Sequence, residues 1–212
     1  MNNSIFEKGY LKFSLKDLNN ELFNQLDSIY DENEFKWTTL VCTTDFKTLD
    51  NNLIEGTTRN KDYITGENIE QFYKNIIKNK IDFHQMFYIG ECENMVFKRL
   101  SSKIIRNIIE NTYNIKYRKP ISTIYTLFTQ GCKINKHVDG IMDGRLCAIL
   151  VYLNKEYTNG DGGELKVNDK TIEPIFGDVV IMDYTKNNVE HSVNEVLNDK
   201  FKRRAILYFA NI

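Results

Sequence analysis

The segment CKINKHVDGIMDGRLCAILVYL, residues 132–153, decides the fold because a polar turn within it leads into a strongly β-prone run. That run is Leu146–Leu153, and the Gly and Asp residues before it are typical of a tight connection. Further short β-prone segments in the second half of the chain, separated by Gly, Asn and Asp, are Ile121–Phe128, Glu164–Val167, Asp178–Met182 and Arg203–Phe209. Short strands at this spacing predict an antiparallel sandwich or jelly roll.

The region before residue 120 has the apolar spacing of helices. Ser14 can cap a helix that runs to about Tyr30, because apolar residues recur there every three or four positions and form one stripe. The stripe consists of Leu15, Leu18, Leu22, Leu26 and Ile29. The same spacing predicts helices over about Ile69–Ile77 and Glu93–Tyr113.

Two other segments of the first half are not helical in pattern. Phe35–Val41 is β-prone, whereas Asp45–Gly66 is polar and rich in turn residues and therefore predicts a long loop. The whole chain, residues 1–212, has the size and apolar content of one domain. We expect an α+β protein in which residues 1–119, mainly helical with one long loop, support a jelly-roll catalytic core at 120–212.

Composition and charge exclude several classes of protein. Lys and Arg (28) nearly balance Asp and Glu (29), so the sequence shows no general attraction to nucleic acid or to an anionic membrane. The first residues lack a signal-peptide pattern, and the longest apolar run, Ala148–Leu153, is too short to cross a bilayer. Four widely spaced cysteines predict reduced thiols. A soluble, cytoplasmic protein is expected; the oligomeric state is open.

Two of the three histidines, His137 and His191, lie in the β-rich half, and the first belongs to an H-x-D tripeptide. On an extended backbone, His137 and Asp139 project from the same face, and His191 can return to them after several strands. Two imidazoles and one carboxylate with open positions suit ferrous iron, although zinc accepts the same ligands. A histidine in a strand beside a surface aspartate is the alternative.

A second candidate is an arginine on the last predicted strand. Alternation places Arg203 on the same face as Ala205, Leu207 and Phe209. An inward guanidinium needs an anion, and its planar group matches a carboxylate. The alternatives are that both arginines are solvated or paired with acidic residues, or that a bulge turns Arg204 inward instead.

The second half resembles the catalytic core of prolyl-hydroxylase-type 2-oxoglutarate oxygenases. The resemblance covers about residues 120–212 and rests on linked motifs in a matching order. They are His137-Val138-Asp139-Gly140, Asp143-Gly144-Arg145-Leu146-Cys147, Tyr152-Leu153-Asn154-Lys155, Gly162-Gly163-Glu164-Leu165, Gly177-Asp178, His191 and Arg203-x-Ala205-Ile206. The sequence departs from that group at Phe209 and Leu127, where those enzymes have tryptophan and tyrosine.

The resemblance implies a double-stranded β-helix in which His137, Asp139 and His191 bind Fe(II). It also implies that Arg203 and the Tyr152 hydroxyl bind the distal carboxylate of the co-substrate 2-oxoglutarate; an ordinary core aromatic is the other interpretation of Tyr152. Dioxygen is the second co-substrate, and ascorbate is a candidate accessory. Arg145 and Phe209 are candidates for the substrate side.

Three hypotheses about the function follow, of which two differ in the substrate and one has no catalysis. The resemblance favours hydroxylation of a prolyl or other residue in a protein or peptide, with release of succinate and CO2. A free amino acid or another small metabolite is the second hypothesis. The third is an interaction module that keeps a metal-binding jelly roll without catalysis. Because Asp139 fills the third ligand position and leaves no vacancy for chloride, the sequence favours hydroxylation over halogenation.

Overall fold

The computed structural model describes residues 7–28, 35–43, 57–59, 64–66, 83–92, 95–139, 144–185 and 189–212. Within these parts thirteen strands join in one antiparallel sheet, whose main path runs β1-β11-β8-β13-β6-β5-β7-β12-β9-β10. The strands are β1 (Tyr10–Ser14), β2 (Phe35–Thr43), β3 (Thr57–Arg59), β4 (Ile64–Gly66), β5 (Phe83–Cys92), β6 (Ile121–Phe128), β7 (Lys133–Val138), β8 (Arg145–Tyr152), β9 (Leu165–Val167), β10 (Lys170–Ile172), β11 (Asp178–Asp183), β12 (Glu190–Val193) and β13 (Arg203–Asn211).

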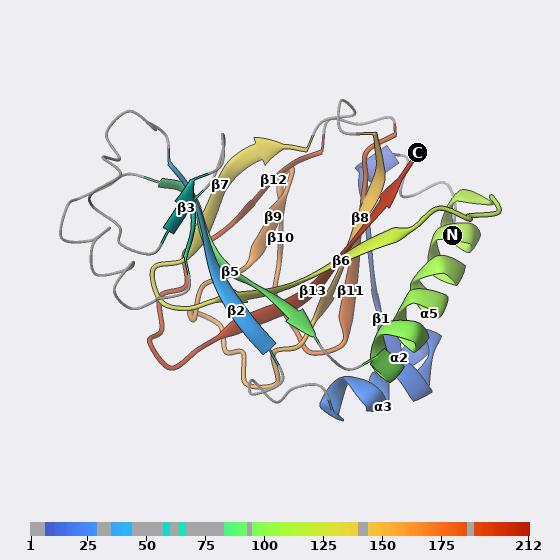
Figure 1. Cartoon of the computed structure of the whole chain (residues 1–212), viewed down its shortest axis with the longest axis horizontal. Helices are drawn as coiled ribbons and strands as arrows, with labels where there is room; N and C mark the ends of the chain where they lie inside the picture. The colour runs from blue at the N-terminus through green and yellow to red at the C-terminus, as the bar shows by residue number, and fades with distance from the viewer. Residues whose placement is uncertain are drawn as a thin grey trace.

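The sheet curls so that one of its faces lines an interior, while helices cover the opposite face. The helices are α2 (Leu15–Leu18), α3 (Asn20–Ser28) and α5 (Met95–Tyr113). Figure 1 shows them on the outer side of β1, β11 and β8, with β7, β12, β9 and β10 across the interior from these strands. This arrangement is the double-stranded β-helix that the second half of the sequence predicted.

Alternation along the strands divides the apolar residues into two cores. On β8, Ala148, Leu150 and Tyr152 pack in the interior of the curled sheet with apolar residues of β9 and β12. Cys147, Ile149 and Val151 face the other way and pack with the apolar residues of α5. Both faces of β8 are therefore buried, which explains its continuous apolar run.

The strands predicted after residue 120 are confirmed to within about two residues. The structure adds β7, β10 and β12, and it continues the last strand to Asn211. Cys132 and Cys147 are buried free thiols. No helix in the described part of the chain is long and apolar enough to span a membrane.

The helix predicted from Ser14 to about Tyr30 is broken at Asn19. Ser14 occupies the N-cap position of α2 but its side chain forms no capping hydrogen bond, and Asn19 is extended, with φ −156° and ψ 98°. The Asn19 Oδ1 accepts a hydrogen bond from the Leu22 backbone N–H at 2.8 Å. Asn19 therefore starts a new helix, because its short amide competes with continued helical bonding.

The prediction that residues 1–119 are mainly helical was incomplete, because five strands of this region also join the sheet. The strand predicted at Phe35–Val41 is present as β2, which pairs with β5. The segment predicted as a long loop, Asp45–Gly66, contains the short strands β3 and β4. The helix predicted over Ile69–Ile77 lies outside the described residues, whereas the one predicted over Glu93–Tyr113 is confirmed as α5.

Because α5 packs on the outer face of the sheet, truncation of one of its buried side chains should lower the stability of the protein strongly. Ile105 is 0% exposed, so Ile105→Ala should lower the free energy of unfolding by about 2–5 kcal/mol through lost burial and a cavity. Urea denaturation measures the change. Lys103→Ala, at an exposed position of the same helix, is the control and should change stability by about 0.5 kcal/mol or less. Equal losses in both variants would contradict this packing.

Candidate metal centre and its cavity

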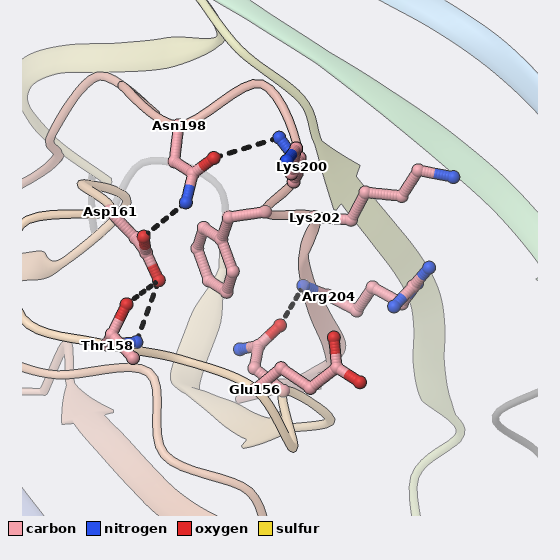
Figure 2. Close-up of a pocket in the computed structure, with 9 residues that line it drawn as sticks. Glu156, Thr158, Asp161, Asn198, Lys200, Lys202 and Arg204 are labelled. Carbon is pink, nitrogen blue, oxygen red and sulfur yellow. Dashed lines mark hydrogen bonds between the residues drawn. The ribbon is translucent and has the colours of Figure 1, made fainter.

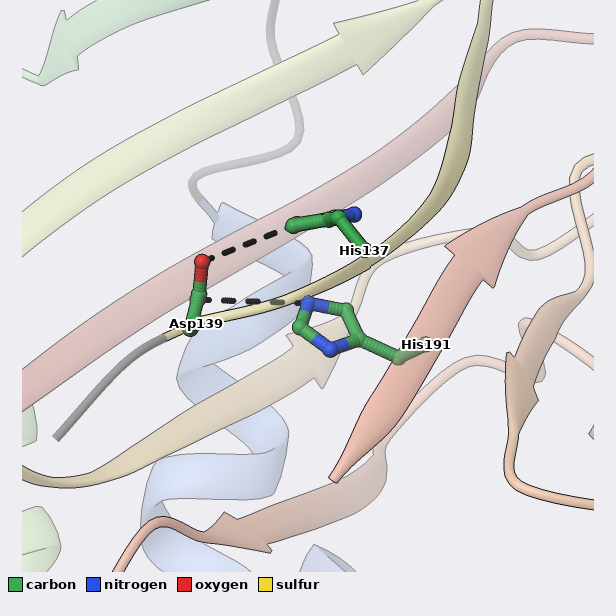
Figure 3. A group of neighbouring side chains, drawn as sticks. All are labelled: His137, Asp139 and His191. Carbon is green, nitrogen blue, oxygen red and sulfur yellow. Dashed lines mark ion pairs between the residues drawn. The ribbon is translucent and has the colours of Figure 1, made fainter. Parts of the chain in front are cut away.

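The pairing of β7 with β12 brings two histidines together. His191 on β12 stands directly opposite His137 on β7, and their ring centroids are 4.2 Å apart. Asp139 follows β7 immediately, and the intervening Val138 is 42% exposed, so it points away from the two polar side chains as alternation requires. Figure 3 shows the three side chains turned toward one another.

The candidate ligand atoms lie close enough to share one cation. The His137 Nε2 is 3.6 Å from the Asp139 Oδ1, and the His191 Nε2 is 3.9 Å from the Asp139 Oδ2. One ligand atom from each of the three residues lies within 4.8 Å of the other two. Two imidazoles and one carboxylate grouped in this way form a face that leaves other coordination positions of a metal open.

Backbone carbonyls orient both imidazoles for metal binding. The His137 Nδ1 lies 2.9 Å from the Asn135 carbonyl oxygen, and the His191 Nδ1 lies 3.0 Å from that of Val189. Because a carbonyl oxygen only accepts, each Nδ1 must carry the proton in the neutral ring, which leaves the Nε2 lone pair for the metal. Burial, and next the nearby His137, lower the pKa of His191 and favour its neutral form.

Two residues hold the carboxylate of Asp139. The Tyr184 hydroxyl donates a hydrogen bond to the Asp139 Oδ2 at 3.0 Å, and the Arg145 Nη1 lies 3.1 Å from the same oxygen. Burial, with the charge of Asp139, raises the pKa of Tyr184 well above its ordinary value, so the phenol remains a donor. Sequence reasoning missed Tyr184, which belongs to no motif and precedes His191 at no characteristic spacing.

The three residues open into a cavity of about 260 Å³ inside the curled sheet. Most of its described walls are apolar, so charges inside it interact more strongly than they would in bulk water. The lining consists of Ile89, Ile124, Thr126, Phe128, Ile134, His137, Asp139, Arg145, Ala148, Leu150, Leu165, Met182, Tyr184, His191, Val193, Arg203, Leu207 and Phe209.

Arg203 lines the same cavity and is almost completely buried, at 1% exposure. Its Nε donates to the Gly163 carbonyl oxygen at 2.6 Å, and its guanidinium carbon lies 4.7 Å from the Phe128 ring centroid and 5.2 Å from that of Tyr152. Burial lowers the pKa of Arg203, yet an arginine stays charged in proteins. A cation is thus fixed in an apolar cavity.

The polar atoms beside Arg203 are suited to a carboxylate ligand. The Arg203 Nη2 and the Tyr152 hydroxyl are buried and form no hydrogen bond within the described part of the chain. Such orphaned donors are costly unless a bound group satisfies them. Burial raises the pKa of Tyr152 although the Arg203 charge lowers it, so the phenol keeps its proton. Two donors and one positive charge fit an anion in the cavity with the histidines.

The neighbouring arginine faces a different cavity. The register of β13 with β6 is continuous from Arg203 to Ala210. No bulge in this pairing therefore turns Arg204 inward in place of Arg203. Arg204 lines a second cavity of about 420 Å³, together with Lys200 and Lys202. Figure 2 shows this second cavity, where the Arg204 backbone N–H donates to the amide oxygen of the neighbouring Asn154.

The paired glycines let the chain pass beside Arg203. Gly163 has φ +77°, and a Cβ there would lie 3.0 Å from the Arg203 Cδ; at Gly162, with φ +80°, a Cβ would lie 2.0 Å from the Glu195 carbonyl oxygen. A side chain would be strained at both positions. The absence of side chains at these two positions therefore lets the connection approach Arg203 closely.

Arg145 and Phe209, the candidates for the substrate side, contact each other at the cavity wall. The Arg145 guanidinium carbon lies 4.1 Å from the Phe209 ring centroid, a cation–π geometry. Arg145 also pairs with Asp139, so it is neither fully solvated nor independent of the candidate metal ligands.

Comparisons with known proteins agree with this geometry. The family model for the 2OG-Fe(II) oxygenase superfamily matches residues 122–211, a range that includes His137, Asp139, His191 and Arg203. None of the curated protein sequences compared with the chain is similar enough to count as a match.

Several solved structures share the fold. A prolyl-4-hydroxylase from Pseudomonas putida has a TM-score of 0.58 and 15% identity, over 99% of this chain and 95% of that one. A Trichoplax adhaerens prolyl hydroxylase, solved with a hypoxia inducible factor peptide fragment, has a TM-score of 0.58 and 16% identity, over 99% and 86%. A 2OG-Fe(II) oxygenase family oxidoreductase from Burkholderia pseudomallei has a TM-score of 0.59 and 13% identity, over 98% and 89%. Residues 122–211 thus form a 2OG-Fe(II) oxygenase domain with a prolyl-hydroxylase-like fold, and this superfamily implies Fe(II), 2-oxoglutarate and dioxygen.

Proposed function

We propose that the protein is a 2-oxoglutarate-dependent hydroxylase that acts on a residue of a protein or peptide, with proline as the first candidate. The observation that carries the proposal is the meeting of His137, Asp139 and His191 in the same cavity as the buried Arg203. The fold shared with a prolyl hydroxylase solved with a peptide fragment supports a peptide substrate.

The three clustered residues would hold Fe(II) through the His137 Nε2, the His191 Nε2 and a carboxylate oxygen of Asp139. With 2-oxoglutarate and dioxygen, bound iron supplies the oxidising power for C–H hydroxylation, while the co-substrate becomes succinate and CO2. The chain contributes ligand orientation: the Asn135 and Val189 carbonyls keep each Nδ1 protonated and each Nε2 available.

Arg203, which lines the same cavity, and the adjacent Tyr152 would orient the co-substrate. The Arg203 Nε is already bonded to Gly163, so Nη2 and the Tyr152 hydroxyl would be the donors available to a carboxylate. Charge-assisted bonds of this kind are about twice as strong as neutral ones, and an apolar wall strengthens them further. Arg145 and Phe209 would shape the substrate side of the same cavity.

Loss of a candidate ligand should abolish metal binding. His137→Ala and Asp139→Ala are each expected to bind no stoichiometric Fe(II) under anaerobic conditions and to release no succinate, because two donors cannot hold the ion at this site. Metal titration and elemental analysis measure the first effect. Val138→Ala is the matched control, because Val138 lies between His137 and Asp139 in the sequence but its side chain points away from them. This variant should bind one equivalent of Fe(II). Full metal occupancy in either ligand variant would remove the basis of the proposal.

Loss of the buried guanidinium should raise the 2-oxoglutarate requirement. Arg203→Ala removes a charge-assisted contact of about 1.5–3 kcal/mol, so the KM for 2-oxoglutarate should rise roughly ten- to 150-fold. Succinate formation at increasing co-substrate concentration measures it. Arg204→Ala is the matched control, since that side chain faces the second cavity. An unchanged KM in the Arg203 variant, or the increase in the Arg204 variant instead, would refute the assignment.

The substrate class can be tested with the intact chain. Incubation with Fe(II), 2-oxoglutarate, ascorbate and a library of proline-containing peptides should produce succinate together with a peptide mass increase of one oxygen atom. The same library with each proline replaced by alanine is the control. Oxygen incorporation that persists without proline would move the proposal to another residue, and turnover with free amino acids alone would favour a small-molecule hydroxylase.

A further inference from the structure

The candidate metal ligand Asp139 is restrained on one oxygen by two donors, Tyr184 and the sequence-near Arg145. The Tyr184 hydroxyl lies 3.0 Å and the Arg145 Nη1 3.1 Å from the Oδ2 atom. The Oδ1 atom faces His137, at 3.6 Å from its Nε2. Because Oδ2 is committed to two donors, Oδ1 is the oxygen with more electron density available for a cation.

Tyr184 is well placed to act through Asp139 rather than on a substrate. It is 0% exposed and lies beside the second candidate histidine, with a ring-centroid distance of 6.4 Å and an interplanar angle of 27° to His191. Its backbone N–H donates to the Leu146 carbonyl oxygen at 3.1 Å. The buried phenol is therefore held beside both Asp139 and His191.

The residue before it, Asp183, sets the turn that presents Tyr184. Asp183 is 0% exposed, and its Oδ1 accepts from the Thr185 N–H at 3.2 Å and the Thr185 hydroxyl at 2.8 Å. The same oxygen accepts from the hydroxyl of Tyr113, the last residue of α5, at 3.0 Å. One buried carboxylate thus fastens the end of β11 to the supporting helix.

The alternation of side chains along β11 explains how the bonds of Asp183 can affect the candidate metal centre. Asp183 pairs in register with Cys147, a residue of the outer core beside α5. Tyr184, one position later, lies in the inner core and lines the cavity. An outward carboxylate bonded to a helix and an inward phenol bonded to Asp139 are consecutive residues, so the position of one restrains the other.

We propose that Tyr184 is a positioning residue for the metal, holding Asp139 as a one-oxygen ligand, and that the Tyr113–Asp183–Thr185 cluster positions Tyr184. The proposal rests on the proposed function of the triad. Its chemical consequence is that the carboxylate is prevented from rotating to place both oxygens on the ion. A coordination position then stays open for the co-substrates, as this type of site requires.

Tyr184→Phe tests the first part without relying on turnover. Removal of a bond to a ligating carboxylate should weaken Co(II) binding about 10- to 100-fold. It should also change the Co(II) d–d absorption spectrum, which reports coordination number. Tyr157→Phe is the matched control, because it loses a tyrosine-to-carboxylate bond of 3.1 Å to Glu164, outside the triad. Wild-type affinity and spectrum in Tyr184→Phe would overturn the proposal.

Asp183→Asn tests the second part through a double-mutant cycle. It should weaken Co(II) binding in the wild-type background but add little in the Tyr184→Phe background, because its effect passes through Tyr184. Tyr113→Phe removes one bond of the same cluster and should give the same pattern if Asp183→Asn fails to fold. Fully additive losses would contradict the coupling.

The same titration separates this proposal from the proposed function. If the wild-type protein and His137→Ala bind Co(II) equally, the triad is not the metal site and both proposals fail. If His137→Ala loses binding while Tyr184→Phe retains wild-type affinity and spectrum, only the positioning role fails.

Discussion

The antiparallel pairing of β7 with β12 is the constraint on which the site depends. It makes His137 and His191 direct cross-strand neighbours although they are far apart in the sequence. The Nδ1 atoms lie against the carbonyls of Asn135 on β7 and of Val189, the residue just before β12. Position and tautomer of both imidazoles therefore follow from one backbone arrangement, and Asp139 joins them because it is two residues from His137.

The rest of the fold serves to keep this pairing and its surroundings rigid. β12 is held on its other side by β9. Val193 at its end and Val189 just before its start are buried in the inner core. Across the interior, β13 carries Arg203 inward and Arg204 outward in one continuous register. The supporting helix α5 packs on the outer face and connects, through Tyr113, to Asp183 at the end of β11. A mainly apolar cavity that contains a charged arginine is thus surrounded by elements that pack against one another.

Much of this arrangement could be predicted from the sequence because it obeys local periodicity. The two-residue repeat predicted that His137 and Asp139 share a face and that Arg203, rather than Arg204, points inward. The placement of two of the three histidines in the β-rich half made His191 the third candidate ligand, and the resemblance to known oxygenases added the double-stranded β-helix and implied the same three ligands. These features depend on spacing within one strand or on linked motifs, both of which a single sequence displays.

Other features depend on contacts that no spacing rule predicts. Asn19 ends α2 and caps α3 through its own amide, a local competition hidden within a regular apolar stripe. β5 forms through pairing with β2, β6 and β7, partners distant in sequence. The bonds from Tyr184 and Arg145 to Asp139 join residues on separate elements, so Tyr184 was missed and Arg145 was expected near the substrate alone.

The most direct test of the account is a crystal structure obtained without oxygen, with Mn(II) in place of iron and with 2-oxoglutarate. The account predicts one anomalous scattering peak bound by His137, Asp139 and His191, and a co-substrate carboxylate on Arg203 and Tyr152. A metal peak elsewhere, or a carboxylate bound away from Arg203 under saturating ligand, would contradict it.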